Sequence, residues 1–169
     1  MEISEAIEKL LPAFERYYTV NKQDPVSPFL AEAEFRSHNE QYFLVRSAHI
    51  ADIDSNEFIY FAGVPVLNDE TLAQLVSKAW TIGLEKVHPH EGHRNSDITL
   101  LILADKIEEP VKTSIKKTKQ YKSYKFSFWG WSNFKLAAVE LDTQGIYSNR
   151  LGKDYRKLLE KNIYGGNFK

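Results

Sequence analysis

The run Ile98–Ala104 (ITLLILA) limits the fold more than any other part of this sequence. Apart from Thr99 it is apolar throughout, and Asp97 and Asp105 bound it on either side. A run of this kind, with no polar side to turn toward water, is typical of a strand that is buried on both faces. The chain must therefore supply packing layers on both sides of a sheet.

The composition favours one soluble globular domain over residues 1–169. Hydrophobic residues make up 43% of the chain and charged residues 27%, which argues against wholesale disorder. The absence of cysteine excludes disulfides and cysteine chemistry and favours a reducing, cytoplasmic location. No apolar run approaches the ~18 residues of a membrane span, and the acidic start MEISEAIEKLLPAF resembles no targeting signal. No membrane partner is therefore expected.

Hydrophobic periodicity predicts the order of helices and strands. Apolar residues at helical spacing predict helices over residues 2–20, 69–87, 106–119 and 150–163. Enrichment in apolar and β-branched residues predicts strands over residues 30–36, 41–50, 56–62, 98–104, 121–128, 134–141 and 146–148. Pro12 predicts a break in the first helix, and Asn68 or Asp69 a cap for the second. Asp105, with Glu108 three residues later, predicts a capping box for the third.

These elements predict an α+β fold with a single mixed, mostly antiparallel central sheet. Short turns join the first three strands, which favours an antiparallel meander. The strand over 98–104, the helix after it and the strand over 121–128 are expected to form a parallel crossover. The sheet then has a buried strand near residues 98–104, and the helices pack on its faces.

The segment from Pro110 to Val139 carries an unusual charge. It holds seven lysines and no acidic residue, which leaves the rest of the chain with 15 basic and 23 acidic residues, or −8. Seven aromatic residues fall between Tyr121 and Phe134. Proteins that bind single-stranded nucleic acid use lysines to neutralise phosphates and aromatic rings to stack on bases.

Strand alternation offers a simpler explanation of the same segment. In a strand over residues 121–128, Phe126 and Phe128 lie on one face and Lys125 and Ser127 on the other. The phenylalanines then belong to the core and the lysine is solvated. On this interpretation nucleic acid is not favoured as a partner.

Two tryptophans flank Gly130, in the turn expected after this strand. An exposed pair of indoles at a turn would mark a binding surface or a homodimer contact. Trp129, Trp131 and the neighbouring Lys125 are therefore the candidate ligand-binding residues.

A loop with three histidines precedes the buried strand. His88, His90 and His93 lie in HPHEGHRNSD, with Glu91 and Asp97 nearby. Imidazole nitrogens bind divalent transition metals, and carboxylates complete or orient such sites. The spacing matches no defined metal signature, so a solvated polar loop is the competing interpretation. A metal-dependent enzyme that uses this loop is the alternative function.

The order α-β-β-β-α-β over residues 2–104 is similar to the core of restriction-endonuclease-like nucleases. Those enzymes need an acidic residue and then a strand with E-x-K or its equivalent. The acidic candidates are Glu34, Asp52, Asp54 and Glu57, and no E-x-K or D-x-K follows them. Without a lysine to orient the attacking water, the similarity predicts at most an inactive relative.

Four short motifs carry a wider resemblance. They are QYFLVR at 41–46, P-H-x-x-H at 89–93, YKFSF-x-G-W at 124–131 and IYSNR-x-G at 146–152. Over roughly residues 30–155 the chain resembles a bacterial family that is known only as a domain of unknown function. The resemblance implies no activity, substrate or cofactor. The residues themselves favour a non-catalytic binding or interaction module with a basic, aromatic face.

Overall fold

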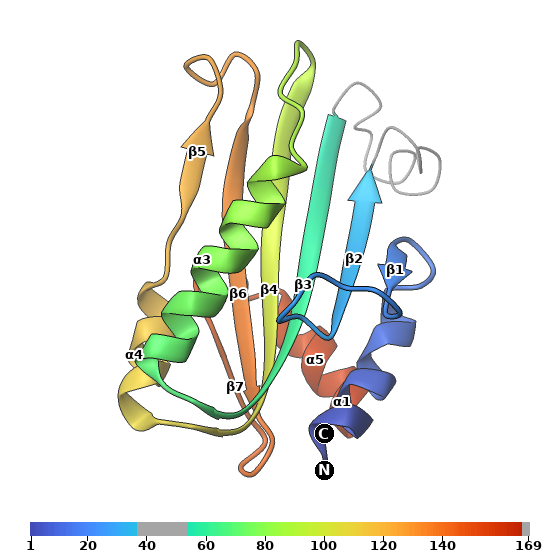
Figure 1. Cartoon of the computed structure of the whole chain (residues 1–169), viewed down its shortest axis with the longest axis vertical. Helices are drawn as coiled ribbons and strands as arrows, with labels where there is room; N and C mark the ends of the chain where they lie inside the picture. Colours follow the sequence, from blue (N-terminus) through green and yellow to red (C-terminus); the bar gives the residue numbers. More distant parts are fainter. Residues whose placement is uncertain (37–53, 167–169) are drawn as a thin grey trace.

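The computed structural model of the chain describes residues 1–36 and 54–166. Within them, a seven-stranded mixed sheet carries helices on both faces (Figure 1). The strands are β1 (Thr19–Asn21), β2 (Ala31–Arg36), β3 (Asp54–Leu67), β4 (His93–Ile107), β5 (Tyr121–Ser123), β6 (Trp131–Glu140) and β7 (Gly145–Ser148). The helices are α1 (Ile3–Leu10), α3 (Asp69–Glu85), α4 (Glu109–Lys117) and α5 (Tyr155–Tyr164). The strand expected over 41–50 lies outside the described residues.

The strand order is β1-β2-β3-β4-β6-β5, and β7 also pairs with β6. The β1–β2–β3 meander is antiparallel, the β3–β4 and β4–β6 pairs are parallel, and both β5 and β7 run antiparallel to β6. The mixed, mostly antiparallel sheet predicted from the sequence is thus confirmed. The prediction that the strand over 121–128 completes the parallel crossover was wrong. β5 is a three-residue antiparallel edge strand, and β6 is the strand that lies parallel beside β4.

Two hydrophobic cores lie on the two sides of β4. Ile98, Leu100 and Ile102 pack with the residues of α3 and α4, whereas Leu101 and Leu103 pack with those of α1 and α5. All five side chains are at most 1% exposed, which confirms a strand buried on both faces. Because each such side chain contributes roughly 1.5–3 kcal/mol on burial, this strand holds both helical layers to the sheet.

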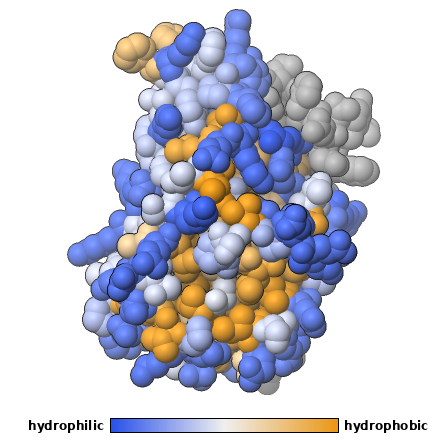
Figure 2. Space-filling model, viewed as in Figure 1, coloured by the Kyte–Doolittle hydropathy of each residue, from blue (hydrophilic) through white to orange (hydrophobic). Residues whose placement is uncertain are grey.

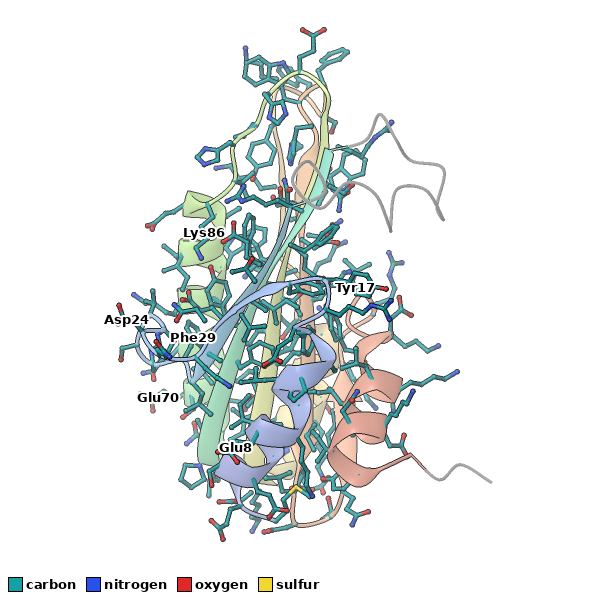
Figure 3. All side chains as sticks on the ribbon, turned by 90° about the vertical axis from the view of Figure 1, so that its right-hand side faces the viewer. Glu8, Tyr17, Asp24, Phe29, Glu70 and Lys86 are labelled. Carbon is teal, nitrogen blue, oxygen red and sulfur yellow. The ribbon has the colours of Figure 1, made fainter. Side chains whose placement is uncertain are left out.

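The two helical layers cover the sheet unequally. The helix α3 runs across most of the length of one face, whereas α1 and α5 cover only the lower part of the other face (Figures 1 and 3). The α3 packing is close: a Cβ on Gly83 would lie 2.7 Å from two atoms of the Ile98 side chain. The Asn68 side chain accepts the Thr71 amide at 2.8 Å, which confirms the predicted cap of this helix.

The predicted start of the third helix was wrong. Asp105 lies inside β4 rather than at a helix cap, because β4 stays paired with β3 as far as the Leu67–Ile107 pair. The amide of Glu108 then donates to the Leu67 carbonyl at 3.1 Å. The helix α4 begins one residue later, at Glu109. Pairing with β3 therefore overrides the capping-box pattern.

Turns determine where the first helix ends and where the last helix begins. Pro12 breaks the first helix as predicted, since α1 ends at Leu10 and a 3-10 turn takes Leu11–Ala13. The last helix begins at Tyr155 rather than near residue 150, because the preceding residues turn around the Asn149 side chain. Nowhere in residues 1–36 and 54–166 does a helix combine the length and apolarity needed to cross a bilayer.

Candidate functional site

Two segments that the sequence singled out meet at one end of the molecule. The loop Tyr124–Gly130, which we term the aromatic tip, projects beside the loop that leads into β4 (Figure 1). The His93 ring joins them, since its Nδ1 lies 2.7 Å from the carbonyl oxygen of Trp129. A Cβ on Gly130 would lie 2.4 Å from the Arg94 carbonyl and 2.7 Å from His93 Nδ1. The histidine loop therefore supports the base of the aromatic tip.

The backbone of the aromatic tip forms a left-handed turn. Lys125, Phe126 and Ser127 have φ angles of 46°, 55° and 72°, a conformation that costs roughly 1–2 kcal/mol for each residue other than glycine. The Phe128 amide donates to the Lys125 carbonyl at 3.0 Å, and the Gly130 amide to the Ser127 carbonyl at 3.1 Å. Strained backbone of this kind is concentrated at functional sites, so the closed turn marks a candidate contact site.

The two phenylalanines of the aromatic tip point into solvent. Phe126 is 95% exposed and Phe128 83%, and Figure 2 shows hydrophobic atoms that project at this end of the molecule. The prediction that both belong to the core was wrong. It assumed strand alternation through residue 128, whereas β5 ends at Ser123 and a left-handed turn follows. Neighbouring apolar groups with this exposure indicate a contact site.

The predicted ligand-binding residues lie at the base of the aromatic tip. Lys125 Nζ lies 3.6 Å from the centroid of the Trp129 ring, in a cation–π contact. Trp131 is the first residue of β6. Both indoles are partly buried, so the exposed aromatic pair at this turn consists of Phe126 and Phe128. Ligand binding by the two tryptophans stays a prediction.

The structure places His93 in a structural role. His93 is 4% exposed, and because the Trp129 carbonyl can only accept, Nδ1 carries the proton and donates to it. Nε2 accepts from the Ser96 hydroxyl at 2.8 Å. His88 and His90 are exposed. Among residues 1–36 and 54–166, no three His, Cys, Asp or Glu side chains converge as metal ligands. Divalent-metal binding by this loop stays a prediction, which elemental analysis would test.

Lysines of the acid-free segment follow one edge of the sheet. Two of the seven are neutralised by acids from outside it, since Lys112 pairs with Glu109 at 2.6 Å and Lys135 with Asp97 at 3.2 Å. The other five are exposed and form no ion pair with an acidic side chain in the described part of the chain. With one exposed arginine they make up what we term the basic edge: Lys116, Lys117, Lys119, Lys122, Lys125 and Arg150. Tyr121, 53% exposed, lies among them.

A polar network on the opposite side of the sheet from α3 centres on Glu57. Its carboxylate accepts hydrogen bonds from the hydroxyls of Thr99 at 2.7 Å, Tyr155 at 2.6 Å and Tyr18 at 2.5 Å. Lys135 Nζ lies 3.8 Å from the same carboxylate and 3.2 Å from that of Asp97. These six residues, which we term the Glu57 network, tie β3, β4, β6 and α5 together.

Of the two nuclease candidates whose side chains the structure describes, Glu57 is the one whose carboxylate joins other ionisable groups on this face. Glu34 lies on the opposite face, where it pairs with Lys86 at 3.8 Å, on the α3 side of the sheet (Figure 3). Glu34 and Glu57 therefore cannot be two ligands of one metal ion. Asp52 and the side chain of Asp54 lie outside the described residues.

Burial and the neighbouring charges shift the pKa values of Asp97, Lys135 and Tyr155 in this network. Burial raises the pKa of Asp97, and the Lys135 charge opposes this rise. Burial would lower the pKa of Lys135, but Glu57 and Asp97 outweigh it and raise that pKa above its ordinary value. Burial and the Glu57 charge also raise the pKa of the Tyr155 hydroxyl. At neutral pH the lysine therefore carries its charge and the tyrosine keeps the proton that it donates.

Asp97→Asn is expected to change how stability depends on pH. Because the pKa of Asp97 is raised in the folded protein, the folded state binds this proton more tightly than the unfolded state. The wild type therefore loses stability as pH rises from the ordinary value of 3.8 through the folded pKa. In urea titrations from pH 3 to pH 7, the free energy of unfolding of the wild type minus that of the variant should fall. A flat or rising difference, or an equal fall in the exposed-acid control Asp142→Asn, would contradict this.

Comparison with known proteins places the chain in a family. Residues 2–161 match a family model described as Domain of unknown function (DUF8052). No curated protein and no solved structure matches the chain. The match takes in all seven strands, β1 to β7, and all the helices described above except the last turn of α5. With almost its whole length matched, the chain belongs to the domain of unknown function family DUF8052, as the resemblance of its motifs implied.

Proposed function

We propose that this protein is a non-catalytic module that binds single-stranded nucleic acid along the basic edge and the aromatic tip. One observation carries the proposal: unpaired cations and exposed aromatic rings share a single edge of the molecule. Tyr121, Phe126 and Phe128 are 53%, 95% and 83% exposed, and the lysines of the basic edge lie before, between and beside them in the chain. None of these lysines forms an ion pair with an acidic side chain among residues 1–36 and 54–166, and all three rings are exposed.

The chemistry of the two sets fits a single strand. Ammonium groups neutralise phosphates and release counterions, and an exposed ring offers a stacking surface worth about 1–3 kcal/mol per base. Stacking is tolerant of sequence because every base has a flat face. The −8 carried by the rest of the chain repels a polyanion from other surfaces and orients it toward this edge.

The distribution of charge favours a strand over two other occupants. A bilayer would meet only the projecting tip, whereas the lysine-bearing segment runs from the end of α4 through the edge strand β5 up to the tip (Figure 1). A second copy of the chain, docked through the tip alone, would bury far less than the ~1,000 Å² of a stable interface. An elongated polyanion contacts the whole basic edge at once.

The aromatic rings are tested by Phe126→Ser/Phe128→Ser. Binding of fluorescently labelled dT15 and dA15, followed by anisotropy at 50 mM salt, should weaken at least about 10-fold in this double variant, since each stacked base contributes about 1–3 kcal/mol. Val66→Ser, at an exposed apolar residue on another face (43% exposed), should leave affinity unchanged and is the matched control.

The salt dependence of oligonucleotide binding, and binding to lipid vesicles, distinguish nucleic acid from a membrane as the partner. The salt slope of single-strand binding falls by about 0.7 for every phosphate that the protein no longer neutralises. Lys119→Ser/Lys122→Ser should therefore lower the slope by about 1.4, and Lys157→Ser, on α5, should not change it. No oligonucleotide binding at 50 mM salt would refute the proposal. Binding to anionic phosphatidylserine vesicles but not to oligonucleotides would show that the tip contacts membranes instead.

A further inference from the structure

A cavity of about 240 Å³ opens on the sheet edge below β5. It lies between the end of α4 and the turn that joins β7 to α5, and Phe134 and Leu151 form its apolar walls. Its charged lining consists of Lys116, Lys117, Lys119 and Arg150, with no acidic side chain. We term it the basic pocket.

The four cations of the basic pocket have little to do in the fold. Lys116 and Lys117 lie in the last turn of α4, where they favour the negative end of the helix dipole. Lys119 and Arg150 have no such role, and none of the four forms an ion pair with an acid among residues 1–36 and 54–166. Four like charges around one cavity repel one another, which an anion in the cavity would relieve.

The Asn149 carboxamide, which we take as the floor of the basic pocket, is held in place and has no hydrogen bond left for a ligand. The Asn149 oxygen accepts the amides of Leu136 at 3.0 Å and Gly152 at 2.8 Å. The Asn149 nitrogen donates to the carbonyls of Thr118 and Phe134, both at 3.0 Å. Since this carboxamide is fully used, a ligand in the pocket is recognised by charge.

We propose that the basic pocket binds the terminal phosphomonoester of the nucleic-acid strand, which deepens the proposed function and rests on it. An internal phosphodiester carries one negative charge, whereas a phosphomonoester carries about −1.5 to −2 at neutral pH. The doubly charged group is the better match for four cations in one cavity. With a single water occupying about 30 Å³ in the liquid, the volume of 240 Å³ accommodates a phosphate together with its first waters.

A second cavity gives the rest of the terminal nucleotide its place. A groove of about 480 Å³ between α3 and α4 shares Thr118 and Lys119 with the basic pocket. Trp80, with Leu72 and Val76, supplies the apolar part of this groove. A phosphate in the basic pocket therefore leaves its sugar and base beside an indole ring, where a base can stack.

The proposal is tested with dT12 that carries a 5′-phosphate, a 3′-phosphate or neither. One phosphorylated form should bind at least 5-fold tighter than the unphosphorylated strand. Lys116→Ser/Arg150→Ser should abolish this preference, whereas Phe126→Ser/Phe128→Ser should weaken all three strands equally and preserve it. Lys153→Ser, at an exposed lysine outside the pocket lining, is the matched control. Equal affinity for the three strands would overturn the proposal.

An experiment with inorganic phosphate tests the basic pocket independently of the proposed binding of single-stranded nucleic acid. At constant ionic strength, phosphate should raise the midpoint of thermal unfolding relative to chloride in the wild type and not in Lys116→Ser/Arg150→Ser, because a ligand stabilises the state that binds it. Phosphate stabilisation without any oligonucleotide binding would support the pocket and refute the strand-binding function. Oligonucleotide binding with no preference for a phosphorylated end and no stabilisation by phosphate would support the strand-binding function and refute the basic pocket as a phosphate site.

Discussion

Replacing Glu57 by leucine is expected to lower the free energy of unfolding by about 3–5 kcal/mol. Glu57 is 8% exposed, and its carboxylate is the common acceptor of hydroxyls from Tyr18, Thr99 and Tyr155. Leucine fills a similar volume but accepts nothing, so three donors lose their partner and Lys135 keeps only Asp97. Urea denaturation at pH 7, followed by far-UV circular dichroism, measures the change.

Two matched variants show whether the effect comes from the Glu57 network. Glu34→Leu removes an acid from the neighbouring strand β2 whose ion pair is partly exposed, and it should cost less than about 1 kcal/mol. Tyr155→Phe removes one hydroxyl that donates to a charged acceptor and should cost about 1.5–3 kcal/mol. A cost below about 1 kcal/mol for Glu57→Leu, the range of an exposed ion pair, would mean that the fold does not need this acid. Glu57, Asp97 and Lys135 would then be candidates for catalysis.

The layered fold follows from patterns that are local in sequence. The apolar run at 98–104 required a layer on each side of a sheet, and the wide apolar stripe on α3 supplied one of them. Both patterns depend only on residues that are close in the chain, so they predict the buried strand and the helix correctly whichever strands pair with each other. The predicted helix cap at Asn68 is confirmed for the same reason, because the bond to Thr71 spans three residues.

The aromatic tip shows why a strong local pattern can mislead. Alternation of aromatic and polar residues over 121–128 is typical of a strand, and it placed Phe126 and Phe128 in the core. Three consecutive left-handed residues without glycine are rare because each is strained, so no propensity scale anticipates them at Lys125–Ser127. Gly130, with its φ of 87°, was the one local sign of a turn, and it marks only where the turn ends.

The Glu57 network depends on information that the sequence does not carry locally. Glu57, Asp97 and Lys135 belong to three strands that meet through two parallel pairings, with Glu57 opposite Asp97 and Lys135 opposite Thr99. A shift of one residue would put Glu57 and Asp97 on opposite faces in the first pairing, or Lys135 on the face opposite Asp97 in the second. The sequence shows only that each of these apolar strands carries one acid or one lysine at an inward position. This pattern does not reveal which strands pair with each other or which residues lie opposite one another.

The edge of β6 depends on one side chain in the gap between two short strands. β5 pairs with residues 131–133 and β7 with residues 137–140, and Asn149 bonds to the backbone of Phe134 and Leu136 between them. Asn149→Ala is expected to lower the free energy of unfolding by about 2–4 kcal/mol, since two amides and two carbonyls lose a partner where Asn149 is 4% exposed.

Two further substitutions test this prediction: Asn149→Asp, which introduces a charge, and Asn162→Ala, which serves as the matched control. Asn149→Asp keeps an acceptor for the Leu136 and Gly152 amides but turns a carboxylate toward the carbonyls of Thr118 and Phe134, so it should destabilise at pH 7 and recover in part as acid protonates it. Asn162→Ala removes one bond, to the Leu158 carbonyl within α5, and should cost less than about 1.5 kcal/mol. If Asn149→Ala cost no more than Asn162→Ala in urea titrations, water would be replacing the carboxamide, and the floor assigned to the basic pocket would not be fixed.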